Sequence, residues 1–243
     1  MLAAHGVTLT PDCRILDFCC GAGDYVKAFA SAGYDIQGFE PYGDLAPVSH
    51  EFSSLGWHYP YRHIQESDVI SGLPDLSVDW RRFRLPYPDA MFDFVFSTEV
   101  MEHISDHDSV LRELRRVMKP DGTAIHSFPA RYRLIEPHIL IPLGGIIKAG
   151  WWYHFWSRLG VNVPNFTGSP FQSPKNLVRL ALWYARGSLH YPPPRKLRAL
   201  GRRYFKISRF EPALWKPENR PGWLYTRTGH VIWYLAEPRA HPL

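Results

Sequence analysis

Short apolar runs alternate with helical periodicity through the first half of the chain. Four runs have the length and apolar content of buried strands: residues 14–20, 35–40, 92–97 and 123–128. Between them, residues 24–32 and a segment capped by Ser105 or Asp106 carry apolar side chains at helical spacing. Gly33 follows the first helix as a stop signal. The alternation predicts a doubly wound, Rossmann-like α/β sheet over residues 14–128.

The pattern changes after Pro129. Residues 130–190 form a mostly helical, aromatic segment, followed by a basic helix near 195–203 and two late strands within 204–215 and 229–238. The interval from 44 to 80 is less regular, and we expect a helix over 44–55 and a strand ending near 78–80. One domain is expected over residues 1–243.

Composition excludes several protein classes and divides the chain. The 243 residues are 45% hydrophobic and 21% charged, which excludes global disorder. The three cysteines support no disulfide framework, and we expect no signal peptide, no spanning helix and a cytoplasmic protein. Net charge is −8 over residues 1–140 and +13 over residues 141–243, which sum to the overall +5. Seven of the nine tryptophans lie beyond residue 150, so the second half is both basic and aromatic.

The first strand leads into a glycine turn that favours a nucleoside ligand. Asp17, Gly21 and Gly23 lie at this strand-to-helix junction, and Glu40 ends the second strand, where a carboxylate can accept ribose hydroxyl groups. The turn lacks the third glycine of a dinucleotide site and the lysine of a P-loop. A ligand without a pyrophosphate therefore fits better than NAD or ATP. The alternative is that the glycines only make a tight turn.

Three ordered segments, at 15–41, 85–104 and 111–129, resemble class I S-adenosylmethionine-dependent methyltransferases, closest to the small-molecule branch with an LPFPD…FD…EH signature. The resemblance covers residues 12–130 and implies a seven-stranded sheet whose cofactor-binding core is followed by a helical lid over 130–190. It implies cofactor contacts from Asp17, Cys19, Gly21, Gly23, Glu40, Asp79, Trp80 and Ser97. Within that set, the first motif holds the methionine end, Glu40 the ribose, and Asp79 and Trp80 the adenine. The spacer after Asp79 is longer than in the family, and Asp68 is the alternative.

Acidic and histidine side chains follow the strands at 92–97 and 123–128. Glu99, Glu102 and His103 share one arc if this segment is helical. The same string resembles metal-ligating triplets in some methyltransferases, with His126 or His138 as a further ligand. It also recurs in relatives without a metal, and we expect no metal here. His138 and Glu136 are the candidates for the acceptor's general base, with His103 as second choice; the alternative for His138 is a structural role.

The expected function is methyl transfer from S-adenosyl-L-methionine to an oxygen of a small or lipid-linked acceptor. Residues 146–160 and the cluster at 195–206 combine aromatic and basic side chains, which predicts peripheral contact with an anionic membrane. The alternative is that these aromatic residues form only a core. Two rival functions remain: an RNA or tRNA methyltransferase that uses the basic half, and a non-catalytic cofactor-binding protein.

Overall fold

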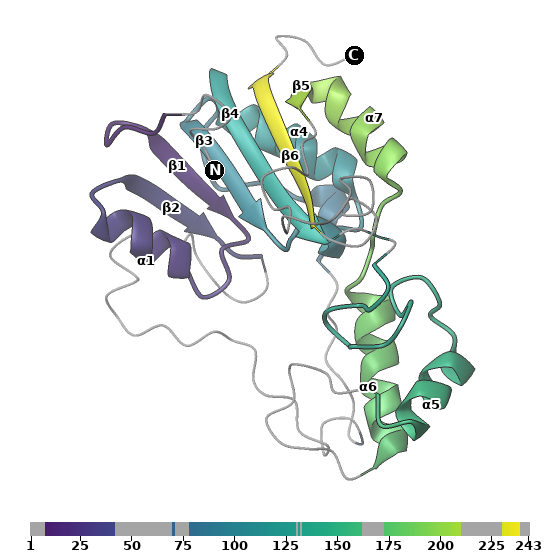
Figure 1. The fold of residues 1–243 in the computed structure, drawn as a ribbon. Coiled ribbons are helices and arrows are strands. Elements are labelled where there is room, and N and C mark those ends of the chain that lie inside the picture. Colours follow the sequence, from purple (N-terminus) through teal and green to yellow (C-terminus); the bar gives the residue numbers. More distant parts are fainter. Residues whose placement is uncertain are drawn as a thin grey trace, which may run out of the picture.

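A six-stranded sheet organises the part of the chain that the computed structural model describes, which is residues 8–41, 70, 78–129, 131, 133–161, 173–209 and 230–238 (Figure 1). The strand order is β2-β1-β3-β4-β6-β5, in which the first four strands are parallel and the last two pair antiparallel at one edge. The strands are β1 (Arg14–Phe18), β2 (Asp35–Phe39), β3 (Phe92–Thr98), β4 (Met118–Pro129), β5 (Phe205–Arg209) and β6 (His230–Pro238). The predicted α/β class is confirmed.

Helices cover both faces of this sheet because consecutive strand residues point to opposite sides. Ile15 lies in a core with Val26 of helix α1 (Asp24–Ser31), whereas Leu16 lies in the larger core that includes the apolar face of helix α4 (His107–Val117). Helix α7 (Pro194–Tyr204) packs beside α4 and completes that larger core. The helical patterns at 24–32, after the cap at Ser105 or Asp106, and at 195–203 therefore correspond to helices in the structure.

Predicted cap residues occupy the helix ends. The Asp106 side chain accepts hydrogen bonds from the Asp108 and Ser109 amides at the start of α4. Gly33 follows α1 with a φ of 88°, a left-handed conformation that favours glycine. Asp106 thus sets where α4 begins in the connection from β3 to β4, and Gly33 sets where α1 ends in the connection from β1 to β2.

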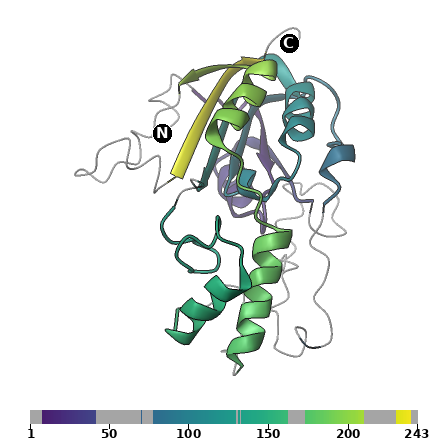
Figure 2. The same cartoon turned by 90° about the vertical axis from the view of Figure 1, so that its right-hand side faces the viewer.

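Helices α5 (Gly150–Arg158) and α6 (Pro174–Gly187) pack together beyond the carboxyl ends of the parallel strands (Figures 1 and 2). They have a core of their own, centred on the fully buried Tyr153, whose hydroxyl donates to the Gly144 carbonyl at 2.8 Å. Aromatic residues thus build part of this unit, as the core alternative predicts, while Trp151 and Phe155 stay exposed. None of the described helices is long and apolar enough to cross a membrane.

Three local predictions differ from the structure or fall outside it. No strand ends at residues 78–80: a short 3-10 helix, η2 (Trp80–Arg82), stands there because Trp80 is buried in the core rather than paired in the sheet. A seventh strand is not among the described residues, and the predicted helix at 44–55 lies outside them. The 99–103 segment is not an α-helix but a turn followed by a 3-10 helix, η3 (Met101–His103).

Candidate functional site

The turn after β1 brings Glu40 to the glycine motif. Cys19, Gly21 and Gly23 all have positive φ, so the chain reverses sharply here. The Gly21 amide donates to Glu40 Oε2 at 2.9 Å, and the Cys20 amide donates to the Phe39 carbonyl at 2.9 Å. The structure therefore places the first-motif residues and Glu40 together, as predicted.

Gly38 makes this junction possible, although the sequence patterns gave no reason to single it out. A Cβ at this position would lie 2.7 Å from Cys20 Sγ and 2.8 Å from Val26 Cγ2, which is closer than real Cβ atoms approach. The Gly38 carbonyl accepts a hydrogen bond from the Tyr87 hydroxyl at 3.0 Å. A side chain at residue 38 would therefore force Cys20 or Val26 to shift, so the close approach of β2 to the turn favours glycine here.

Asp17 is a buried carboxylate suited to a cationic ligand. It is 2% exposed, and its Oδ2 accepts no hydrogen bond from any described residue. Burial, with the added charge of Glu40, raises the pKa of Asp17 to about 7. A bound cation would offset the cost of this carboxylate pair. S-adenosylmethionine carries an ammonium and a sulfonium group, and the residues of this edge fit it.

The other predicted cofactor residues lie in different surroundings. Ser97 is buried near the carboxyl end of β3, with its hydroxyl 2.7 Å from Nδ1 of His126 on β4. Asp79 is exposed and lies 3.9 Å from Arg82, while Trp80 packs against Phe83 in the core. Phe83 in turn packs against Phe18 and Phe39, which adjoin Asp17 and Glu40 in sequence, so Trp80 lies in the same aromatic cluster as the ends of β1 and β2. Asp68 lies outside the described residues.

A second group of side chains lies beyond the ends of β3 and β4. The rings of His103 and His138 meet edge to face, with centroids 5.0 Å apart. Glu102 Oε1 is 3.7 Å from His103 Nε2 and 3.9 Å from His138 Nε2, and Glu102 is fully buried. Burial and the neighbouring Glu99 raise the pKa of Glu102 above its usual range.

His138 is held by a buried carboxylate. Its Nδ1 donates to Glu136 Oε1 at 2.7 Å, while its own amide and that of Ile139 donate to Glu136 Oε2 at 2.8 and 2.9 Å. The Tyr191 hydroxyl also donates to Glu136 Oε1, at 2.9 Å. Burial alone would raise the pKa of Glu136, but these hydrogen bonds hold it below its ordinary value. The imidazole is thereby oriented, with Nε2 directed toward Glu102.

This group also has the composition of a metal site. His103 Nδ1 donates to the Ser188 carbonyl at 2.9 Å, so its Nε2 is left to face Glu102. Burial and the charge of His138 lower the pKa of His103 to about 4. One ligand atom from each of Glu102, His103 and His138 lies within 4.8 Å of the others. His138 donates to a carboxylate and His103 to a backbone carbonyl, and both bonds orient the imidazole rings. Two imidazoles oriented in this way can hold a divalent ion together with one carboxylate.

The predicted triplet at 99–103 is thus only partly brought together. Glu99 leaves β3 with a φ of 57°, and its amide donates to the Ser127 carbonyl. It is not part of the group of close ligand atoms, which includes His138 instead. His126 is held within β4 beside Ser97 and is not in that group either.

Electrostatic interactions extend from the turn after β1 toward the histidine group. Burial raises the pKa of Cys19, and the neighbouring Glu40, Cys20, Asp17 and, least, Glu102 raise it further. Glu102 is therefore within electrostatic reach of the turn after β1. A ligand bound at that turn would lie at the same sheet edge as His103 and His138, where open α/β sheets bind ligands.

Comparisons with known proteins identify the family of this chain. A family described as "Methyltransferase domain" matches residues 7–204. A demethylmenaquinone methyltransferase of Lactobacillus johnsonii is 28% identical over 157 residues, which are 62% of this chain and 56% of that protein. A ubiquinone biosynthesis O-methyltransferase of Pseudomonas syringae pv. tomato is 30% identical over 118 residues, covering 47% of this chain and 43% of that protein.

A solved structure shares the fold across nearly the whole chain. The S-adenosylmethionine dependent methyltransferase of Mesorhizobium loti superposes with a TM-score of 0.50 at 17% identity, covering 97% of this chain and 95% of that one. The curated relatives match less completely, since the chain spans about half of their length.

Proposed function

Because the chain belongs to the methyltransferase domain family, we propose that it transfers the methyl group of S-adenosylmethionine to an oxygen of a small or lipid-linked acceptor. The observation that carries this proposal is His138, which a buried Glu136 orients beside the cofactor-binding edge. Names of relatives support the acceptor class: they include demethylmenaquinone and 2-phytyl-1,4-naphtoquinone methyltransferases and a ubiquinone O-methyltransferase. A quinone-type ring with an isoprenoid tail matches these names, which differ in the acceptor atom: the relative from Pseudomonas syringae pv. tomato is named an O-methyltransferase and one from Burkholderia mallei a C-methyltransferase. The choice of oxygen therefore depends on His138 and not on the relatives.

The bound cofactor would supply an electrophilic methyl group, and the protein would supply position and charge. Asp17 and the Cys19–Gly23 turn would bind its cationic methionine end, and Glu40 its ribose. Positioning the acceptor oxygen in line with the methyl carbon accounts for most of the expected rate gain.

His138 would remove the acceptor's proton. Its Nδ1 is committed to Glu136, so Nε2 is the atom that would accept the proton from a hydroxyl. The resulting imidazolium would lie 2.7 Å from the Glu136 carboxylate and 3.9 Å from Glu102. The Glu136 carboxylate would stabilise the charge that develops on His138 during transfer.

The test is incubation with radiolabelled cofactor and fractionated lipids, RNA and small molecules. We expect label in the lipid or small-molecule fraction. We also expect His138→Ala to lower turnover on the order of 100-fold or more while changing cofactor affinity less than about threefold. The matched control is His154→Ala, an exposed histidine on α5. Label in RNA would favour the rival enzyme, and cofactor binding without transfer to any fraction would favour a non-catalytic protein.

A metal-assisted version is a second candidate, favoured by the three converging ligand atoms of Glu102, His103 and His138. Metal content of the purified protein and turnover after chelation separate the two. The general-base proposal expects no stoichiometric divalent ion and unchanged turnover after chelation. A bound ion that Glu102→Gln releases, with turnover restored to the chelated enzyme by adding it back, would establish the metal-assisted version instead.

A further inference from the structure

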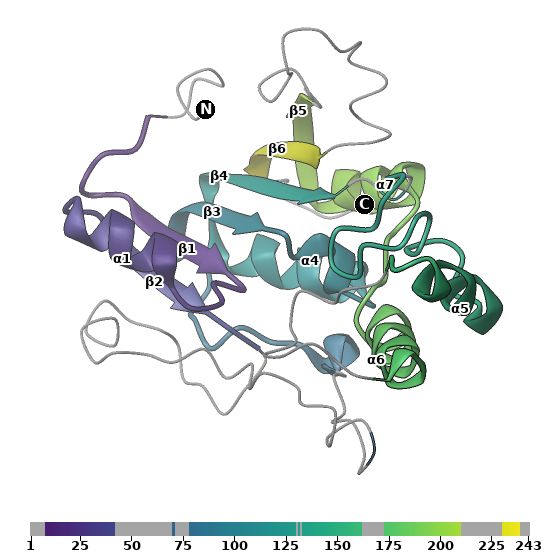
Figure 3. The same cartoon turned by 60° about the horizontal axis from the view of Figure 1, so that its bottom comes forward.

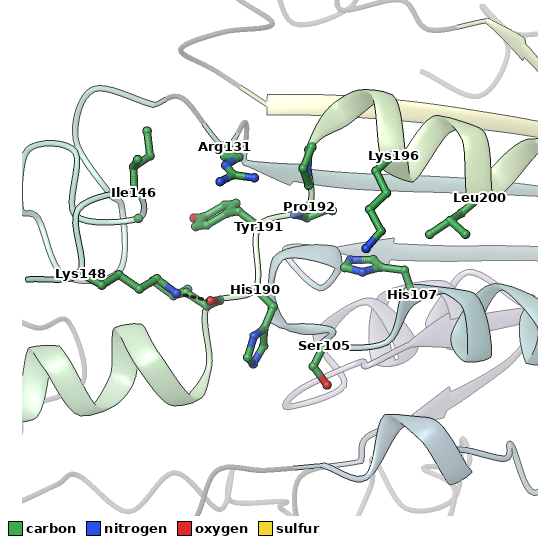
Figure 4. Close-up of a pocket in the computed structure, with 13 residues that line it drawn as sticks. Ser105, His107, Arg131, Ile146, Lys148, His190, Tyr191, Pro192, Lys196 and Leu200 are labelled. Carbon is green, nitrogen blue, oxygen red and sulfur yellow. Dashed lines mark hydrogen bonds between the residues drawn. The ribbon is translucent and has the colours of Figure 1, made fainter.

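A cavity of about 370 Å³ lies behind the histidine group, along residues 188–193, the linker between α6 and α7. Three cationic side chains line it: Arg131 from the segment after β4, Lys148 from the approach to α5, and Lys196 from α7 (Figure 4). None of the residues that line it is an aspartate or glutamate. The lining therefore concentrates positive charge, which Glu136, bonded to the Tyr191 hydroxyl outside the lining, offsets in part.

Lys148 is built into the cavity wall. Its Nζ donates to the Leu189 carbonyl at 2.5 Å, which fixes the ammonium group at the linker. Burial lowers the pKa of Lys148, and the charge of Arg131 lowers it further, against the opposing effect of Glu136. An anion between Lys148 and Arg131 would relieve the repulsion between the two cations.

The start of α7 adds to this positive potential. Pro192 and Pro193 line the cavity, and the 11-residue helix begins at Pro194 with no side chain capping it. The first amides of a helix carry a partial positive charge and accept anions. Lys196, in the first turn of the same helix, is exposed and lines the cavity.

We infer that this cavity binds a phosphate or diphosphate group. Phosphate oxygens match a cluster of guanidinium and ammonium donors beside a helix start. The group can belong to a lipid, such as a phospholipid head or a polyprenyl diphosphate, or to a water-soluble phosphate ester. This binding does not require the proposed methyl transfer to be correct.

The linker connects this cavity to the proposed catalytic group. Tyr191 lines the cavity and donates its hydroxyl to Glu136, the residue that orients His138. The His190 amide donates to the Glu102 carbonyl from the same linker. Tyr191 alone thus lies between an anion in the cavity and the Glu136–His138 pair. A bound anion could therefore anchor a methyl acceptor beside His138 or order the linker.

The experiment is calorimetric titration of the full chain with inorganic pyrophosphate at low salt. Lys196→Gln and Arg131→Gln should each weaken binding about tenfold, because each removes one charge-assisted contact. Arg202→Gln is the matched control: it removes the same charge from an exposed position of α7 outside the cavity. Cofactor affinity should stay unchanged in all three variants, which shows that each is folded.

Competition identifies the source of the phosphate group. Displacement of pyrophosphate by vesicles of phosphatidic acid in phosphatidylcholine would indicate a lipid. Displacement by soluble phosphate esters would indicate a small molecule. Either result supports the cavity as the site. Two results overturn it: no pyrophosphate binding by the wild-type protein at low salt, or a loss in Arg202→Gln as large as in Lys196→Gln. The second result would mean that only diffuse charge attracts the anion.

Discussion

At the scale of single residues, the site is a set of buried carboxylates held at unfavourable positions. Asp17, Glu102 and Glu136 are at most 2% exposed. Only Glu136 is fully supplied with hydrogen-bond donors. Asp17 and Glu102 instead face places where a ligand, a protonated imidazole or an ion would supply the missing charge. Such groups reduce the stability of the free protein, and ligand binding offsets that cost.

Asp17 makes cofactor affinity depend on pH. Its folded-state pKa is about 7, above the unfolded value of 3.8, so the folded protein holds a proton that the unfolded chain has released between these values. The contribution of Asp17 to the free energy of unfolding therefore falls as the pH rises toward 7. The attraction of Asp17 for a cationic ligand grows over the same range, because more of its carboxyl group is ionised. Calorimetry should show tighter cofactor binding, by about tenfold, at pH 8 than at pH 6.

The variant Asp17→Asn should remove this pH dependence and weaken cofactor binding at pH 8. Its free energy of unfolding without cofactor should rise by roughly 1–3 kcal/mol at pH 8, because the variant removes a buried charge whose Oδ2 has no hydrogen-bond donor among the described residues. Asp24→Asn, at an exposed position in the first turn of α1, is the control. An unchanged pH profile in Asp17→Asn would assign the titration to another group.

Glu136 is predicted to be a positioning residue. Glu136→Gln keeps the shape but loses the charge that supports a protonated His138, so we expect kcat to fall about 10–100-fold with KM nearly unchanged. Tyr191→Phe removes one of the four donors to Glu136 and should cost less, up to about tenfold. Steady-state kinetics measure both, and a change in KM alone would contradict the assignment.

At the scale of elements, strands and helices were predictable where the apolar residues of a segment are also the residues that it buries. Val110 and Leu114 of α4, for example, show their buried face directly in the sequence. The 99–103 segment was not predictable, because a tertiary hydrogen bond from the Glu99 amide to the Ser127 carbonyl sets its turn. The pairing of Glu102 with His138 likewise depends on β3 and β4 ending at the same edge.

A substitution at Gly38 tests whether the turn after β1 depends on the close approach of β2. Gly38→Ala would force Cys20 and Val26 away from β2, so we expect a loss of about 1–3 kcal/mol in unfolding free energy and weaker cofactor binding. Gly187→Ala is the matched control, since a Cβ there meets nothing within 4 Å at the end of α6. Chemical denaturation should find the control within about 1 kcal/mol of the wild type. Equal effects of the two substitutions would show that the turn tolerates a side chain.

At the scale of the whole molecule, the acidic edge of the sheet and the helices of the basic half come from different parts of the chain. The sheet edge gathers carboxylates from β1 and the segments after β2, β3 and β4, while α5, α6 and α7, which belong to the basic half of the chain, lie on the side of Figure 3 opposite β1 and β2. Basic and apolar side chains together are typical of surfaces that meet an anionic membrane. An acceptor with an isoprenoid tail would be presented from such a surface.

Helix α5 is the element that we expect to make this contact. Trp151, Phe155 and Leu159 recur every four residues along α5 and just past its end, and are 67%, 50% and 60% exposed, whereas Tyr153 on the other face is buried. A combined Trp151→Ser and Phe155→Ser variant should reduce co-sedimentation with anionic vesicles about tenfold or more, since it removes most of the exposed aromatic area.

The control for the membrane contact is Tyr25→Ser, since Tyr25 on α1 is an aromatic residue exposed to the same extent as Phe155. Raising the salt concentration should weaken binding of the wild type further, because part of the attraction is screened. Full retention of binding in the α5 variant would place the contact elsewhere, and no binding by the wild type at low salt would remove the membrane from the proposed function. A lipid-linked acceptor would then have to be delivered in soluble form, and the anion cavity would be the remaining means of holding it.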